Sequence, residues 1–178
     1  MININQELMP ETTDQTALLR WITAGLSIPE VKSLHGDALY LLGNMVAKFT
    51  LAAPQYCISL EALNYLEALK INLEATYPRS KFYGRNSPFI YEHCIPANVV
   101  RAQILQAKPE EQIIRKILMQ AGSVTVLLRS EDQKLTASGL RHSMPKSWCW
   151  GDDPFARYKA VGILISEKFL KLTGKIMR

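Results

Sequence analysis

The stretch GSVTVLLRSEDQKLTASG, residues 122–139, decides the fold class of this chain. Within it, Val124–Leu128 joins three β-branched residues to two leucines, which predicts the clearest strand in the sequence. Gly122 ends a helical pattern that runs over 109–121. Ser130, with a glutamine three positions later, predicts a capping box at the start of a further short helix. A strand with a helix on each side therefore predicts mixed α and β structure for this part of the chain.

The first part of the chain carries three amphipathic helical patterns. Thr12, Thr13 and Asp14 offer N-cap residues to the first of them. Pro29 suits the first turn of a second helix, where its missing N–H has no cost, and Pro54 ends that helix. Ser59 caps a third pattern, which Pro78 stops. We expect these helices to form a small bundle.

The remaining segments alternate between short strand and helix patterns. We expect a strand over 89–95, helices over 97–107 and 152–161, a third strand over 163–165 and a basic amphipathic tail from residue 167. Together these patterns predict an α+β fold, in which an N-terminal helical bundle packs on a small sheet with C-terminal helices.

Length and composition exclude several classes of protein. The 178 residues are 48% hydrophobic, which is typical of a globular domain and excludes a disordered chain. Cys57, Cys94 and Cys149 are widely spaced, which fits a reducing compartment and argues against a zinc knuckle. No segment approaches the roughly 18 apolar residues of a membrane span, and residues 1–10 lack the pattern of a secretory signal. We therefore expect a cytoplasmic protein without a membrane partner.

Charge is divided unevenly along the chain. Residues 1–78 contain 4 Lys/Arg and 8 Asp/Glu, a net charge of −4, whereas residues 79–178 contain 17 and 8, a net charge of +9. We expect one domain over 1–178, in which an acidic helical part, 1–78, is joined to a basic α+β part, 79–178. An asymmetry of this size favours a polyanion, DNA or RNA above all, as the partner of the basic part.

A basic and aromatic segment opens the second half. Arg79, Lys81 and Arg85 alternate with Phe82 and Tyr83 between two prolines. Cationic side chains bind a phosphate backbone, and an aromatic ring can stack on a base. The segment is therefore a candidate nucleic-acid-binding loop, with Arg79, Lys81, Tyr83 and Arg85 as its binding residues.

An acid and a histidine are adjacent in the string YEHCIP, residues 91–96. The order acid, His, any residue, Ile or Val, Pro resembles the first element of the HNH (His-Me finger) nucleases, and the resemblance covers residues 89–100. It implies that Glu92 ligates a divalent metal ion such as Mg²⁺. It also implies that His93 is the general base that removes a proton from the attacking water.

A second arrangement with acidic residues follows the predicted strand. Glu131, Asp132 and Lys134 form a D-x-K triplet. In restriction-type nucleases, the carboxylates of such a triplet bind Mg²⁺ and the lysine steadies the attacking water. There the triplet lies on the strand itself, whereas here Ser130 predicts that a helix has already begun.

A third arrangement needs no metal ion. A metal-free RNase uses one histidine to deprotonate the 2′-OH and a second acid to protonate the leaving oxygen, while arginines neutralise the phosphate charge. His93 and His142 suit the first two roles, and Arg141 and Arg157 suit the third. The sequence alone does not show whether these residues meet in space.

The sequence thus predicts nucleic-acid binding with phosphodiester cleavage, centred on Glu92 and His93. The alternative is a non-enzymatic adaptor or regulator, whose basic half docks nucleic acid or an acidic protein and whose N-terminal helices bind a protein partner. Motifs typical of NTPases, dinucleotide-binding enzymes and α/β-hydrolases do not occur in the sequence.

Overall fold

The computed structural model describes residues 11–33 and 36–174. In this part of the chain the strands form one mixed sheet with the order β2-β5-β1-β4-β3. β1 pairs with β4 in parallel and with β5 antiparallel, and β3 pairs antiparallel with β4. The strands are β1 Gln55–Ser59, β2 Thr76–Pro78, β3 Phe89–His93, β4 Val124–Leu128 and β5 Ile165–Thr173.

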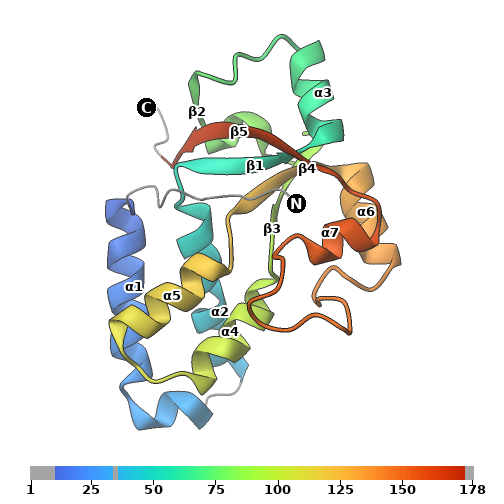
Figure 1. Ribbon diagram of the computed structural model, residues 1–178. Helices are drawn as coiled ribbons and strands as arrows, with labels where there is room; N and C mark the ends of the chain where they lie inside the picture. Colours follow the sequence, from blue (N-terminus) through green and yellow to red (C-terminus); the bar gives the residue numbers. More distant parts are fainter. Residues whose placement is uncertain (1–10, 34–35, 175–178) are drawn as a thin grey trace.

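A helical bundle lies at one end of this sheet (Figure 1). Its core joins leucine and isoleucine side chains from both halves of the chain, among them Leu19, Ile22, Ile104 and Ile114. The bundle helices are α1 Thr13–Leu26, α2 Gly36–Leu51, α4 Ala97–Gln106 and α5 Glu111–Gln120. A 3-10 turn, η1 Pro29–Ser33, follows α1.

Each face of the sheet is covered by its own elements, as the two remaining hydrophobic clusters show. On the α3 face, Ile58 and Val126 pack with Leu66 of α3 Leu60–Ala68 and with Phe82 of the 3-10 turn η2 Arg79–Phe82. On the α7 face, Cys57 and Leu127 pack with side chains of α6 Arg129–Ala137 and α7 Ala156–Ala160. Neighbouring residues of a strand point to opposite faces, so each strand contributes alternate side chains to the two clusters.

The α+β fold class is confirmed, and so are several local predictions. β4 has the predicted bounds, and Thr12 and Ser59 cap α1 and α3 through their side-chain oxygens. The start of α6 differs from the prediction, because the helix begins at Arg129 instead of Ser130. The carboxylate of Glu131 accepts the backbone N–H of Leu128 at 2.8 Å and so satisfies a free donor of the first turn.

The first half differs more from the prediction. β1 lies buried in the middle of the sheet, where the sequence pattern predicted only a junction between helices. The third helix ends at Ala68, and the side chain of Leu69 is 53% exposed. α3 packs on the sheet and not in the bundle, whose other members, α4 and α5, come from the second half. The acidic part is therefore not purely helical.

The C-terminal part also contains more strand than expected. β5 runs for nine residues, Ile165–Thr173, where a short strand and a basic amphipathic tail were predicted. Within the described residues, no helix is both long and apolar enough to span a membrane.

Candidate functional site

Arg157 organises the region where the predicted site residues meet. The aspartate side chain of Asp153 accepts the N–H of Phe155 at 3.0 Å just before α7, which places Arg157 in the first turn of that helix. The side chain of Arg157 is 0% exposed. Its five N–H groups donate to the carbonyl oxygens of Cys94 (3.0 Å), Leu140 (2.9 Å), Arg141 (3.1 Å) and His93, and to Glu92 Oε1 (2.5 Å).

This set of bonds satisfies the guanidinium completely, since arginine has five N–H donors. Arg157 therefore has no donor left for a phosphate, and its predicted role as a phosphate ligand does not fit the structure. Instead, Arg157 joins the end of β3 to the loop that carries Arg141 and His142. Residues separated by about fifty positions in the sequence are thereby held in one place.

Glu92 and His93 lie on opposite faces of the sheet. Glu92 pairs with Thr125 and His93 with Val124 across the β3–β4 ladder. The Glu92 side chain lies on the α7 face, where it meets Arg157. His93 lies on the α3 face and reaches the C-terminal end of α2.

The imidazole of His93 has a defined tautomer. Thr50 donates its hydroxyl hydrogen to Ala47 O at 3.0 Å, and its Oγ1 lies 2.8 Å from His93 Nδ1. A threonine hydroxyl has one hydrogen, so a Thr50 that donates to Ala47 O accepts from His93 Nδ1–H, and we infer this tautomer for His93. Nε2 then carries the free lone pair and can accept a proton. Burial, with the charge of Arg157 as a smaller cause, lowers the pKa of His93 to about 4.

Glu92 does not have the environment of a metal ligand. Its Oε1 accepts from Arg157, and burial raises the pKa of its carboxyl, an effect that the Arg157 charge only partly offsets. Among residues 11–33 and 36–174, no three His, Cys, Asp or Glu side chains group closely enough to hold a metal ion. The donor set around Glu92 therefore does not fit the metal ion that the HNH resemblance implies.

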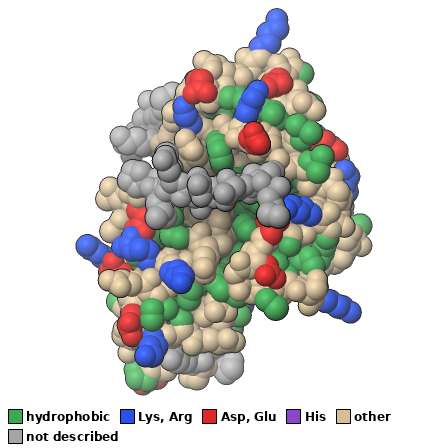
Figure 2. Space-filling view, viewed as in Figure 1, with side chains coloured by type: hydrophobic (Ala, Val, Ile, Leu, Met, Phe, Trp, Pro, Cys, Tyr) green, Lys and Arg blue, Asp and Glu red, His purple; other side chains and the backbone are tan. Residues whose placement is uncertain are grey.

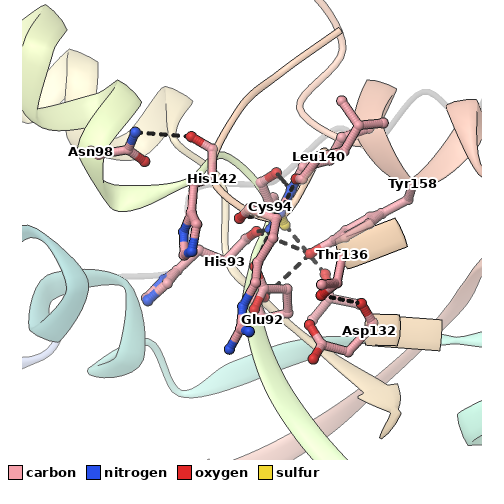
Figure 3. Close-up of polar contacts among 12 residues, drawn as sticks. Glu92, His93, Cys94, Asn98, Asp132, Thr136, Leu140, His142 and Tyr158 are labelled. Carbon is pink, nitrogen blue, oxygen red and sulfur yellow. Dashed lines mark hydrogen bonds and ion pairs between the residues drawn. The ribbon is translucent and has the colours of Figure 1, made fainter. Parts of the chain in front are cut away.

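His142 lies beside the same strand end. Asn98, in the first turn of α4, donates to His142 O at 2.9 Å, and Arg157 binds the preceding carbonyl, that of Arg141. Figure 3 shows the imidazoles of His93 and His142 on the side of the cluster opposite Asp132 and Tyr158. Arg141 and His142 are both exposed, so their side chains are open to solvent. The structure thus brings the segments of His93, Arg141 and His142 together, which the sequence alone did not show.

Several further groups near Arg157 have shifted pKa values. Burial raises the pKa of Cys94 and of Tyr158 well above their usual ranges. Tyr158 donates its hydroxyl to His93 O at 3.0 Å, and Cys94 Sγ lies 3.3 Å from Thr125 Oγ1. Shifted groups of this kind concentrate at functional sites, although structural networks produce them as well.

The D-x-K residues are spread over α6 and do not form one site. Glu131 is buried, and its Oε2 accepts from Ser59 Oγ at 2.6 Å as well as from the backbone of Leu128. Lys134 pairs with Glu61 at 3.4 Å on the surface. Glu131 therefore anchors the start of the helix, and the triplet lies on that helix and not on a strand.

The four predicted nucleic-acid-binding residues of the loop differ in their exposure to solvent. Arg79 is half-buried and donates to Leu51 O at 2.6 Å, so its guanidinium faces α2. Lys81, Tyr83 and Arg85 are exposed. The Lys81 ammonium lies 3.8 Å from the centre of the Tyr77 ring. The structure thus leaves three of the four predicted binding residues at the surface.

The charge division of the sequence is partly neutralised inside the molecule. Among the described residues, basic side chains of the second half form ion pairs with glutamates of the first half: Lys134–Glu61 (3.4 Å), Lys168–Glu67 (2.7 Å), Lys171–Glu74 (2.8 Å) and Arg115–Glu11. Exposed pairs of this kind contribute only about 0–1 kcal/mol each. On the face drawn in Figure 2, basic and acidic side chains are interspersed. The excess charge of the second half is therefore only partly available to an external polyanion.

Comparison of the chain with protein-family models, curated proteins and solved structures found no match. The functional interpretation therefore depends on the geometry of this site. Thr50 and Tyr158 belong to that geometry, yet sequence reasoning did not select them. Thr50 lies 43 positions from His93, and no motif connects the two. Tyr158 follows Arg157 directly, but a tyrosine at that position is not a recognisable signal.

Proposed function

We propose that this protein binds RNA and cleaves it without a metal ion, using His93 as the general base. The observation that carries the proposal is the 2.8 Å contact of Thr50 Oγ1 with His93 Nδ1, from which we infer that Nε2 keeps the free lone pair. Burial lowers the pKa of His93 to about 4, which keeps the imidazole neutral at neutral pH but makes it a weaker base than one that titrates near pH 7. A neutral imidazole held in one orientation is the form that a general base requires.

The other roles follow from the loop that Arg157 holds against β3. His93 takes the proton of a ribose 2′-OH, and the resulting O2′ attacks the adjacent phosphorus. The bond between phosphorus and O5′ breaks, and His142 donates a proton to the leaving O5′. Arg141, exposed on the same loop, neutralises charge on the phosphate. The products are a 2′,3′-cyclic phosphate and a free 5′-hydroxyl.

This route is favoured over the HNH-like route by the pairing of Glu92 with Arg157. A metal ion at Glu92 would compete with a buried guanidinium for the same carboxylate. The metal-free route does not need the Glu92 carboxylate, because its proton transfers use imidazoles only.

The direct test is incubation of the wild-type protein with single-stranded RNA and with DNA of the same sequence, in EDTA and in Mg²⁺. We expect RNA cleavage in EDTA, intact DNA because it lacks the 2′-OH, and loss of cleavage in His142→Ala. Cleavage of DNA, or cleavage that requires Mg²⁺, would support the HNH-like route instead.

A second candidate is the adaptor function, which a different observation favours. Four large hydrophobic side chains of the N-terminal helices are exposed: Trp21 (69%), Ile28 (52%), Tyr40 (66%) and Leu41 (60%). Exposed apolar side chains mark a protein-binding surface where they form a contiguous patch. If the protein is an adaptor, it leaves RNA and DNA intact under every condition. An identified binding partner is then lost when Trp21 and Leu41 are both replaced by serine.

A further inference from the structure

The exposed tyrosine of the basic loop has the geometry of a base-stacking surface. Tyr83 is 68% exposed, and its ring stacks on Tyr91 with the ring centres 5.8 Å apart and the planes 20° apart. Tyr91 covers one face of the Tyr83 ring. The exposure of Tyr83 leaves the remaining surface of the ring to solvent.

The ring is held in place before any ligand binds. Arg129, at the start of α6, donates to Ser87 O at 2.6 Å and to Gly84 O at 2.7 Å, which ties the loop to the end of β4. Gly84, next to Tyr83, has a φ of 141°, a conformation that favours glycine and turns the chain at this point. Tyr91 is itself fixed, because its hydroxyl donates to Arg79 O at 2.8 Å. A preorganised ring loses little conformational entropy when a ligand stacks on it.

The charges around the ring suit a nucleic acid. No acidic residue occurs between Arg79 and Tyr91 in the sequence, and the side chains of Lys81 and Arg85 are exposed. A base could therefore stack on Tyr83 while its phosphates meet cationic side chains on either side.

The stacking surface lies on the same face of the sheet as the proposed general base. Tyr91 and His93 are two residues apart on β3, so their side chains share a face and are separated by about 6.8 Å along the strand. A base that stacks on Tyr83, above Tyr91, would thus lie near the residue that acts on the RNA chain.

We propose that Tyr83 is a stacking platform for an unpaired base and that the substrate is single-stranded RNA. This inference rests on the proposed function, which it extends by naming the class of substrate. Bases in a duplex already stack on their neighbours and do not offer a free face to an aromatic side chain, whereas those of a single strand do.

The test separates binding from cleavage by using an RNA in which every 2′-OH is methylated and which therefore cannot be cut by this route. Fluorescence anisotropy measures the affinity of the full chain for this oligonucleotide as a single strand and as a duplex. The variants are Tyr83→Ala, Tyr83→Phe and, as a matched control, Tyr40→Ala, which removes another tyrosine of 66% exposure.

We expect the wild type to prefer the single strand and Tyr83→Ala to lower that affinity by about 5- to 150-fold, the range for loss of one stacked base. Tyr83→Phe keeps the ring and should bind within about twofold of the wild type, as should Tyr40→Ala. Unchanged binding by Tyr83→Ala, or equal binding of duplex and single strand, would overturn the inference. Stacking without cleavage of unmodified RNA would leave it standing and refute the proposed catalysis, whereas a wild type that binds no nucleic acid refutes both.

Discussion

Glu92 and His93 are neighbours in the sequence, but they belong to two different regions of the molecule. On the α7 face, Glu92 meets a buried arginine whose donors are all satisfied, an arrangement that holds the fold together. On the α3 face, His93 keeps one ring nitrogen free, and a threonine from a distant helix fixes its orientation. The comparison teaches that a short motif can combine a structural residue with a chemical one, and that the strand alternation separates them.

The largest effect on stability should come from breaking the α7 face. Arg157→Met removes the bonds that join β3 to the loop and leaves Glu92 buried without its partner. We expect a loss of roughly 3–5 kcal/mol in the free energy of unfolding, the usual effect of removing one member of a buried ion pair. Urea denaturation measures it. The control Arg141→Met alters an exposed arginine and should change stability by less than about 0.5 kcal/mol.

The pH dependence of stability sharpens the comparison. The pKa of His93 is about 4 in the folded protein and about 6.5 in the unfolded chain, so the unfolded chain binds more protons between these values. Above pH 6.5, His93 is neutral in both states and does not lower the stability. As the pH falls to 4, the unfolded chain takes up a proton that the folded protein does not, and the free energy of unfolding falls by up to about 3 kcal/mol. The raised pKa of Glu92 acts in the opposite direction.

Comparison of the wild type with His93→Asn isolates this contribution, because Glu92 is common to both proteins. The difference between their unfolding free energies should shrink as the pH falls from 6.5 to 4. A difference that stays constant over this range would mean that the pKa of His93 is not lowered in the folded protein.

A smaller effect is expected from Thr50. Thr50→Val removes the acceptor for His93 Nδ1–H, and an unsatisfied buried donor costs about 1–3 kcal/mol. Thr50→Ser retains the hydroxyl and should stay close to the wild type. The ¹⁵N chemical shifts of the imidazole report the tautomer directly: we expect a protonated Nδ1 in the wild type and in Thr50→Ser. A protonated Nε2 in the wild type would contradict the assigned tautomer.

The smallest expected effect is the salt dependence of RNA binding. If the exposed cations Lys81, Arg85 and Arg141 contact about three phosphates, log K should fall against log[salt] with a slope near −2 for a single strand. A slope clearly steeper than −3 would show that cations beyond these three also contact phosphates.

The sequence predicted the fold class and the elements with strong local signals. β4 and the cap at Ser59 were predicted because each depends on a few adjacent residues, and Thr12 was one of three candidate caps for α1. β1 was missed because a short apolar run between two helices does not distinguish a buried strand from a helix end. β5 was predicted too short, since its charged residues, Glu167, Lys168 and Lys171, recur at three- and four-residue steps like those of a basic helix.

The sequence selected residues whose segments the structure brings together, and it did not predict the contacts that each residue makes. Glu92, His93, Arg141, His142 and Arg157 were all predicted, and Arg157 brings their segments together. The role of Arg157 was wrong, because its burial depends on the packing of α7 against the sheet and not on any local pattern. Thr50 was missed for the same reason, since only the tertiary fold places the end of α2 beside β3.

The most direct test compares the cleavage of single-stranded RNA in EDTA by the wild type, His93→Ala and Glu92→Gln. It asks whether the residues on the α3 face carry out the chemistry while those on the α7 face stabilise the structure. We expect the wild type to cleave, His93→Ala to lose about 10²- to 10⁴-fold in rate as for other positioned general bases, and Glu92→Gln to cleave at a rate close to the wild type while it remains folded. An inactive Glu92→Gln that is still folded, or an unchanged rate in His93→Ala, would contradict this division of roles.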